Sequence, residues 1–250
     1  MTDPTRILAP GAAVWQGAGA TAFAGRVARA EGWTRVLLVR DPGVAALPFA
    51  AALHASLAEA GIAVALFDGV LPDPPVESVA AAHAALDGTT PDAVVSLGGG
   101  SAIDIAKALA ACLAEARGAD TLPDRPPARA LPHLAVPTTA GTGAEASKSS
   151  ILTDAAGRKR AIIADCLAPR AVLLDPMVLA GQPRGLVVSC GLDAFSHGLE
   201  SLVSRQGTTA SRMLSRECIR LVARALPRLL AAPDDAAAMA ELQLGAHLGG

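Results

Sequence analysis

Short apolar runs alternate with longer segments of helical periodicity over the first two thirds of the chain. Runs rich in valine, leucine and isoleucine, each about the length of one strand, start near residues 35, 62, 93, 133 and 171. The helical patterns that precede the first two of these runs end at Gly32 and Gly61, which suit helix C-caps. Strands that alternate with helices through short connections are typical of a parallel sheet with helices on both faces. The pattern therefore predicts an α/β domain.

The pattern changes after about residue 183, where only helical periodicity remains. Residues 208–232 predict a long amphipathic helix bent near Pro227, and a further helix follows with Asp234 or Asp235 as its cap. We therefore expect an α/β domain over 1–182 and the beginning of an all-α domain over 183–250. This second part is short for a domain with its own core. We expect it to be C-terminally truncated and to expose apolar surface.

Composition narrows the classes of protein. Of the 250 residues, 52% are hydrophobic but only 2% are aromatic, so alanine, valine, leucine and isoleucine must build the core. The formal net charge of -2 gives no basic surface for nucleic acid or an anionic membrane. No run predicts a membrane span, and MTDPTRILAPG does not resemble a signal peptide, so we expect a cytoplasmic protein. The four cysteines lack CxxC spacing and predict buried, reduced thiols: Cys112, Cys166, Cys190 and Cys218.

A glycine stretch is the first candidate for chemistry. The strand DAVVSL runs directly into Gly98, Gly99, Gly100 and Ser101, and a helix follows. Glycines let a ligand approach the backbone, and a helix N-terminus offers free N–H groups to a phosphate. The stretch is neither GxGxxG nor a P-loop, and a plain tight turn is the alternative. Asp41 ends an earlier strand, where it either binds a ribose hydroxyl or caps an Asp-Pro-Gly turn.

A second candidate is GLDAFSHGLES, residues 191 to 201. Asp193 and His197 are four residues apart, so on a helix they share one face. A carboxylate and an imidazole can bind a divalent metal, but two ligands do not complete its coordination shell.

Four motifs occur in order along the chain: GGGSAIDIAK, PTTAGTGAEAS, GRKRAIIADCLAPRAVLLDP and GLDAFSHGLES. Together they resemble the signatures of the iron-containing (group III) alcohol dehydrogenases. The resemblance implies a Rossmann-like N-terminal domain that binds NAD (or NADP) and a helical domain that binds a divalent metal, usually Fe2+. It implies an alcohol dehydrogenase or aldehyde reductase in which the metal acts as a Lewis acid for hydride transfer.

The resemblance also implies roles for particular residues. The glycine stretch and Ser101 would hold the pyrophosphate, and Asp41 would lie near the adenosine ribose, favouring NAD over NADP. Arg160 stands where a lysine often touches the cofactor, with Lys159 as a substitute. The cofactor cleft would be lined by Thr138, Thr139 and Thr142. We expect Asp104 and Lys107, at i and i+3, either to brace the loop or to form a surface ion pair.

Asp193 and His197 match the first two metal ligands of the family. The two later histidines of the family have no counterpart, and His247 falls before their place, so we expect it on a helix surface or in the core. The partner would be a small alcohol or aldehyde, and the resemblance leaves a homodimer open. The alternatives are an inactive nucleotide-binding remnant, a metal-independent oxidoreductase like maleylacetate reductase, and the chemistry of dehydroquinate synthase or glycerol dehydrogenase.

Overall fold

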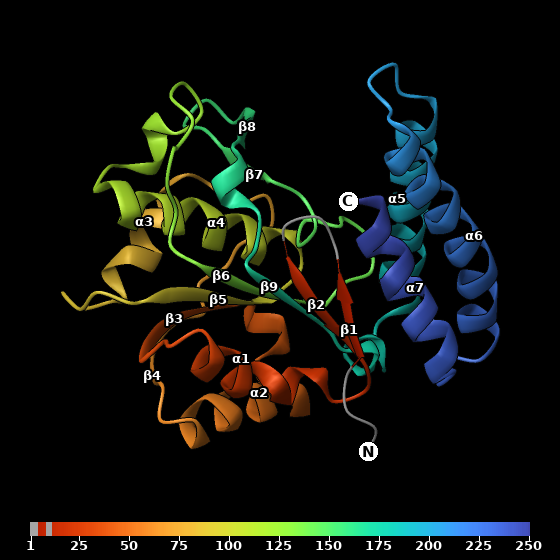
Figure 1. Cartoon of the computed structure of the whole chain (residues 1–250), viewed down its shortest axis with the longest axis horizontal. Coiled ribbons are helices and arrows are strands. Elements are labelled where there is room, and N and C mark those ends of the chain that lie inside the picture. The colour runs from red at the N-terminus through yellow and green to blue at the C-terminus, as the bar shows by residue number, and fades with distance from the viewer. Residues whose placement is uncertain (1–4, 9–11) are drawn as a thin grey trace.

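The computed structural model describes residues 5–8 and 12–250, which form a sheet with helices on both faces and a helical segment beside it (Figure 1). The strands of the sheet are β1 (Thr5–Leu8), β2 (Ala13–Gln16), β3 (Arg35–Arg40), β4 (Ala63–Phe67), β5 (Ala93–Gly98), β6 (His133–Pro137) and β9 (Ala171–Leu174). Their order is β1-β2-β9-β6-β5-β3-β4. β1 and β2 pair antiparallel, and the other pairs are parallel. The predicted parallel sheet is confirmed.

Helices cover both faces of this sheet. They are α1 (Ala24–Ala30), α2 (Pro48–Glu59), α3 (Glu77–Ala84) and α4 (Gly100–Glu115). Val36 and Leu38 of β3 pack in the cluster formed with α1 and α2, whereas Leu37 and Val39 pack in the cluster formed with α3 and α4. A strand buried on both sides must be apolar at every position, which is why RVLLVR shows no polar alternation.

A second, two-stranded sheet was not predicted. β7 (Ser149–Thr153) and β8 (Lys159–Ile163) form an antiparallel hairpin in a region for which the sequence pattern predicted no strand. The turn is held by Asp154, whose carboxylate accepts hydrogen bonds from Ala156 N and Arg158 N. Leu152 and Ile162 face the α4 side and are buried. Only one side of the hairpin is buried, and the apolar Ile151 and Ile163 lie on the other side, so the sequence shows no clean alternation.

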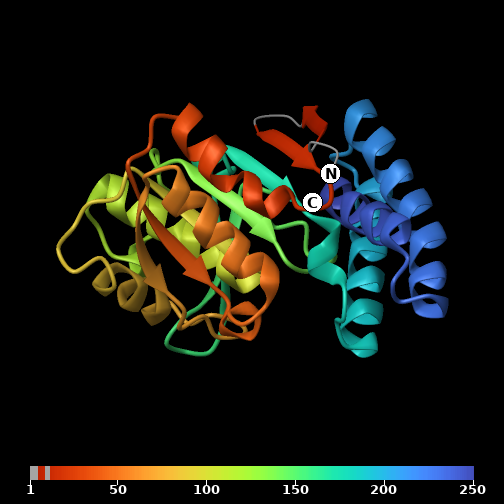
Figure 2. The ribbon, with the colours of Figure 1, turned by 90° about the horizontal axis from the view of Figure 1, so that it is seen from below.

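From Arg184 onward the chain is helical, as predicted. Three helices, α5 (Arg184–Val203), α6 (Thr209–Ala231) and α7 (Ala236–Gly249), lie side by side at one side of the α/β part (Figures 1 and 2). Asp235 caps α7 by accepting a hydrogen bond from Ala238 N, as predicted. α6 continues through Pro227 as one helix. None of the helices in the described part of the chain is long and apolar enough to cross a membrane.

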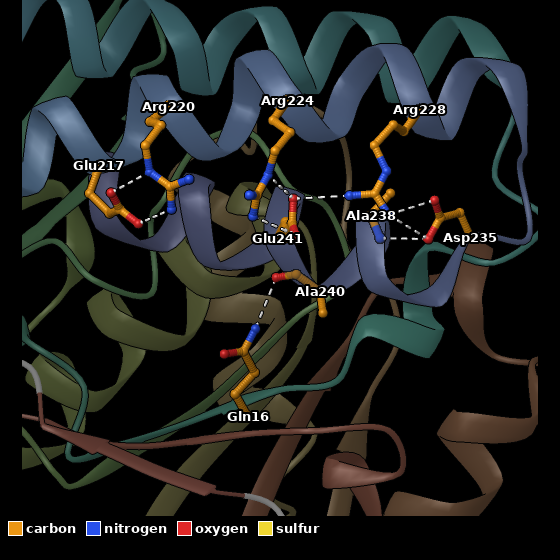
Figure 3. A network of polar contacts seen from close by, with 9 residues as sticks. All are labelled: Gln16, Glu217, Arg220, Arg224, Arg228, Asp235, Ala238, Ala240 and Glu241. Carbon is orange, nitrogen blue, oxygen red and sulfur yellow. Dashed lines mark hydrogen bonds and ion pairs between the residues drawn. The ribbon is translucent and has the colours of Figure 1, made fainter.

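Ion pairs join α6 to α7 on their outer side (Figure 3). Arg224 donates two hydrogen bonds to the carboxylate of Glu241, at 2.8 and 2.6 Å. Arg228 pairs with Asp235 at 2.8 Å. Gln16 of β2 donates to Ala240 O at 2.9 Å, so α7 is also tied to the edge of the large sheet.

The helical segment exposes apolar side chains, as predicted. Leu192 and Val203 of α5 are 55% and 72% exposed, and Leu199 and Met213 are also largely accessible. The interior of the segment is a separate apolar cluster that includes Ala194, Cys218 and Leu242.

Candidate functional site

The glycine stretch forms a close contact between three segments of the chain. Gly98 ends β5, Gly99 is the N-cap of α4, and α4 starts at Gly100. A Cβ on Gly98 would lie 2.9 Å from the Cβ of Asp41, and one on Gly100 would lie 3.1 Å from the Cγ2 of Thr142. Small residues are therefore required here because the chain passes so near. The first turn of α4 also presents backbone N–H groups here, and these can donate hydrogen bonds to a phosphate.

Asp41 shows the turn geometry. Its Oδ1 accepts a hydrogen bond from Gly43 N at 2.8 Å, which caps the Asp-Pro-Gly turn. Its own backbone N–H donates to Leu97 O, so the residue lies beside the end of β5. This bond uses one of the two carboxylate oxygens. Asp41 lies at the carboxyl end of β3, where a ribose would be bound in an open α/β fold.

Residues 138–148, named here the threonine loop, connect β6 to β7. Thr142 is exposed and lines the cleft described below. Thr139 faces Gly99, because a Cβ there would lie 3.2 Å from its Oγ1. Thr138 is buried and is not among the residues that line that cleft, and its N–H donates to Gly98 O at 2.9 Å. Thr138 therefore lies beneath the surface that a cofactor would touch.

Lys107 of α4 holds the threonine loop from below. Its side chain is fully buried, and Nζ donates to the carbonyl oxygens of Ala144, Ser147 and Ser149 at 2.7, 2.7 and 2.8 Å. The expectation of a loop brace is confirmed, and the alternative of a surface ion pair is wrong because the loop covers the amine. Burial lowers the pKa of Lys107, and the charges of Asp104 and Glu145 oppose that shift.

Asp104 is the acidic neighbour of Lys107 and lines the cleft. Burial raises the pKa of its carboxyl, and the positive charge of Lys107 acts in the opposite direction.

Arg160 and Lys159 lie on opposite faces of β8, because side chains alternate along a strand. Arg160 pairs with Asp124 at 2.6 Å and is not among the residues that line the cleft. Lys159 does line it and pairs with Asp73 at 2.7 Å. The structure thus brings Lys159, rather than Arg160, to the candidate site.

Asp193 and His197 face each other on α5, with Oδ1 and Nε2 3.6 Å apart. Their side chains are 44% and 36% exposed, so both can bind a metal ion that enters from solvent. Within residues 5–8 and 12–250, no three side chains of histidine, cysteine, aspartate or glutamate come together to hold a metal. The two side chains fit part of a divalent metal site, since a carboxylate oxygen and an imidazole nitrogen are ordinary ligands of such ions.

One cleft of about 590 Å³ contains both candidates. Its lining includes Gly100, Ser101 and Thr142 from the cofactor side and Asp193 and His197 from α5. Glu200 and Ser201 of α5 also line the cleft, and sequence reasoning missed them. Their positions seven and eight residues after Asp193 place them on the same helix face, which was the available signal.

His247 and the cysteines lie outside the candidate metal pair. His247 is buried, with Nδ1 3.3 Å from Oε1 of Glu145, so it is a core residue rather than a surface one. All four cysteines are free, as predicted, but only Cys112 and Cys218 are buried, whereas Cys166 and Cys190 are partly accessible. Burial raises the pKa of Cys112 and Cys218 to about 11, which makes these two thiols unreactive.

Comparison with known proteins decides the family. The model of the iron-containing alcohol dehydrogenases matches residues 11–176, and the model of the C-terminal part of the same family matches residues 187–250. The chain belongs to the iron-containing alcohol dehydrogenase family. The predicted resemblance is therefore confirmed.

Three relatives illustrate the similarity. An NAD-dependent methanol dehydrogenase from Bacillus methanolicus is 28% identical over 94% of this chain and 62% of its own length. An iron-containing alcohol dehydrogenase from Thermotoga maritima superposes with a TM-score of 0.89 at 31% identity, over 98% of this chain and 68% of that one. A sulfoacetaldehyde reductase from Bifidobacterium kashiwanohense, solved with NAD+, gives 0.89 at 25% identity, over 100% and 66%. The chain thus spans less than two thirds of the length of its methanol dehydrogenase relative.

Proposed function

We propose that this chain forms the cofactor site and half of the metal site of an NAD(P)-dependent alcohol dehydrogenase or aldehyde reductase. The observation that carries the proposal is the single cleft lined by Ser101 and Thr142 on one side and by Asp193 and His197 on the other. A hydride transfer requires the cofactor and the polarised substrate oxygen to meet in one place. Membership of the family supports the same activity.

The cofactor assignment rests on the turn between β5 and α4. The N-terminus of α4 offers backbone N–H groups and the positive end of the helix dipole to a pyrophosphate. Ser101 and Thr142 add hydroxyl groups at the same edge of the cleft. Asp41, at the end of β3, favours NAD over NADP because its carboxylate would repel a 2′-phosphate. The NAD-dependent relative and the relative solved with NAD+ support this choice.

Asp193 and His197 would hold the metal, for which iron(II) is the proposed ion. Bound there, such an ion would polarise the oxygen of the alcohol or aldehyde. The two side chains supply two ligands, so a four-coordinate ion would need two more. The chain's own contribution is to hold these two donors one helical turn apart and open to the cleft.

A nucleotide-binding chain without turnover is the second candidate. The observation that favours it is that the described residues offer no third metal ligand beside Asp193 and His197. A metal-independent oxidoreductase fits less well, because both donors are present and open to the cleft. Reconstituting the chain with iron(II) and following NADH formation from NAD with ethanol or propanediol separates these cases.

We expect turnover that falls by roughly a hundred-fold or more in Asp193→Asn and His197→Gln, since each removes a direct metal ligand. Arg216→Gln, an exposed change on α6, serves as the control that keeps activity. NADH binding without turnover in the parent chain would support the second candidate. Absence of NADH binding would remove the cofactor assignment itself.

A further inference from the structure

The threonine loop is packed between the glycine turn and the helical segment. Gly141 touches α5, because a Cβ there would lie 2.9 Å from Cys190 Cα. Gly143 has a φ of +59° and touches the end of α7, because its Cβ would lie 2.9 Å from Ala246 O. Thr142, the residue between these glycines, faces Gly100 instead. Any movement of the loop relative to α5 and α7 would therefore move Thr142 relative to the glycine turn.

The one polar side-chain bond between this loop and α7 joins Glu145 and His247, as far as residues 5–8 and 12–250 show. Oε1 and Nδ1 are 3.3 Å apart, and the two side chains are only 4% and 2% exposed. Two polar groups buried in this way leave each other unsatisfied if the loop and the helix separate. The contact joins residues 102 positions apart in sequence, so it ties two distant segments.

Charge around the pair comes from the cofactor side. Lys107 lies close enough for the carboxylate of Glu145 to affect its ionisation, and the Nζ of Lys107 is bonded to three carbonyls of the same region. Glu145 thus stands between a buried cation on α4 and a buried imidazole on α7. The loop is held from both sides by groups that water does not reach.

We propose that Glu145 and His247 are positioning residues that hold the threonine loop against α7, so that Thr142 stays over the glycine turn where a nucleotide phosphate would bind. This inference rests on the proposed cofactor site. It gives a function in the site to a histidine that is not a metal ligand, and it makes the helical segment a determinant of nucleotide affinity.

The test compares NADH affinity, loop exchange and thermal stability in the full chain. In His247→Ala we expect the dissociation constant for NADH to rise by about ten-fold, since one buried polar contact is worth roughly that factor. Amides of residues 139–149 should exchange faster with deuterium. His247→Asn, whose amide nitrogen can replace Nδ1, should restore most of the affinity. The double variant with Glu145→Ala should be no weaker than His247→Ala, because both remove one shared contact.

The matched control is His133→Ala, which alters another buried histidine, bonded to Ser96 at 2.8 Å on strands of the large sheet. It should lower the melting temperature and leave NADH affinity and loop exchange unchanged. His247→Phe, which fills the same space without a polar atom, replaces His247→Ala if that variant does not fold.

A lower melting temperature in His247→Ala with NADH affinity and loop exchange as in the parent would overturn the proposal. If the parent chain does not bind NADH, the proposed function fails. Deuterium exchange then tests the positioning role by itself, and unchanged exchange over residues 139–149 in His247→Ala would overturn it.

Discussion

The polar side chains buried beside the cleft and those that line it differ in how completely the protein satisfies their hydrogen-bonding groups. Lys107 is fully buried, and three carbonyl oxygens of the threonine loop and β7 accept its hydrogen bonds. Asp193 and His197, on α5 at the cleft, are partly exposed, and their Oδ1 and Nε2 atoms lie 3.6 Å apart. A fully bonded buried group fixes the shape of a site, whereas open donors and acceptors remain available to a ligand. The first region should therefore matter for folding and the second for binding.

The largest effect on stability is expected for Lys107→Met. The change removes the buried amine that donates to three carbonyl oxygens, of which Ala144 O still accepts from Ser147, so we expect a loss of about 3 kcal/mol or more in the free energy of unfolding. Urea denaturation measures it. Lys148→Met is the control, since Lys148 is an exposed lysine of the same loop, paired with Asp165. A loss below about 1 kcal/mol for Lys107→Met would show that the loop does not depend on this amine.

Acid should destabilise the folded chain through the buried His133. Burial lowers the pKa of His133 to about 3, whereas in the unfolded chain it is near 6.5. Between these values the unfolded state binds a proton that the folded state does not, so stability is lost as the pH falls below 6.5. The contribution should reach about 2 kcal/mol at pH 5. Unfolding free energies measured from pH 7 to 5 should fall less steeply in His133→Gln, and equal slopes would contradict the assignment.

The outer ion pairs of the helical segment should have an intermediate effect. Arg224→Ala removes the two-bond contact with Glu241 between α6 and α7, shown in Figure 3. Because Arg224 is half exposed, we expect a loss of only about 0.5–1 kcal/mol, reduced further by salt. Arg216→Ala, at an exposed position of the same helix, is the control for helix propensity. Equal losses in the two variants would mean that the pair contributes nothing.

The smallest effect on stability is expected for Asp193→Ala and His197→Ala. Their mutual contact is long and solvated, so each should change the free energy of unfolding by no more than about 0.5 kcal/mol. Binding of iron(II) or cobalt(II), followed by calorimetry, should weaken in both. A loss of stability near that of Lys107→Met would reverse the comparison and make this pair structural.

Local patterns in the sequence predict the large sheet and its helices, because apolar runs and capping residues are local signals. They also predict that Asp193 and His197 share one face of a helix, since the helical repeat alone determines this. They miss the hairpin of β7 and β8, where Leu152 and Ile162 are the buried members of a short alternation. The family resemblance places Thr138 and Arg160 at the cofactor, and neither is among the residues that line the described cleft.

Contacts between distant segments are beyond such patterns. The bond from Glu145 to His247 and those from Lys107 to the threonine loop depend on how α4 and α7 pack, which no local window contains. The number of metal ligands is likewise a property of the packed helices. Within the described residues no three candidate ligands come together, so Asp193 and His197 on α5 remain a predicted pair.

The cofactor site at the glycine turn can be tested by titrating the parent chain, Ser101→Glu and Ser101→Gln with NADH and following the fluorescence. Glutamate in the first turn of α4 suits the helix dipole and preserves the fold, but its charge would repel the pyrophosphate. Glutamine has nearly the same size without the charge. We expect tight binding in the parent chain, a loss of roughly ten-fold or more in Ser101→Glu and a much smaller loss in Ser101→Gln. Equal NADH affinity in all three proteins would contradict a cofactor site at the glycine turn.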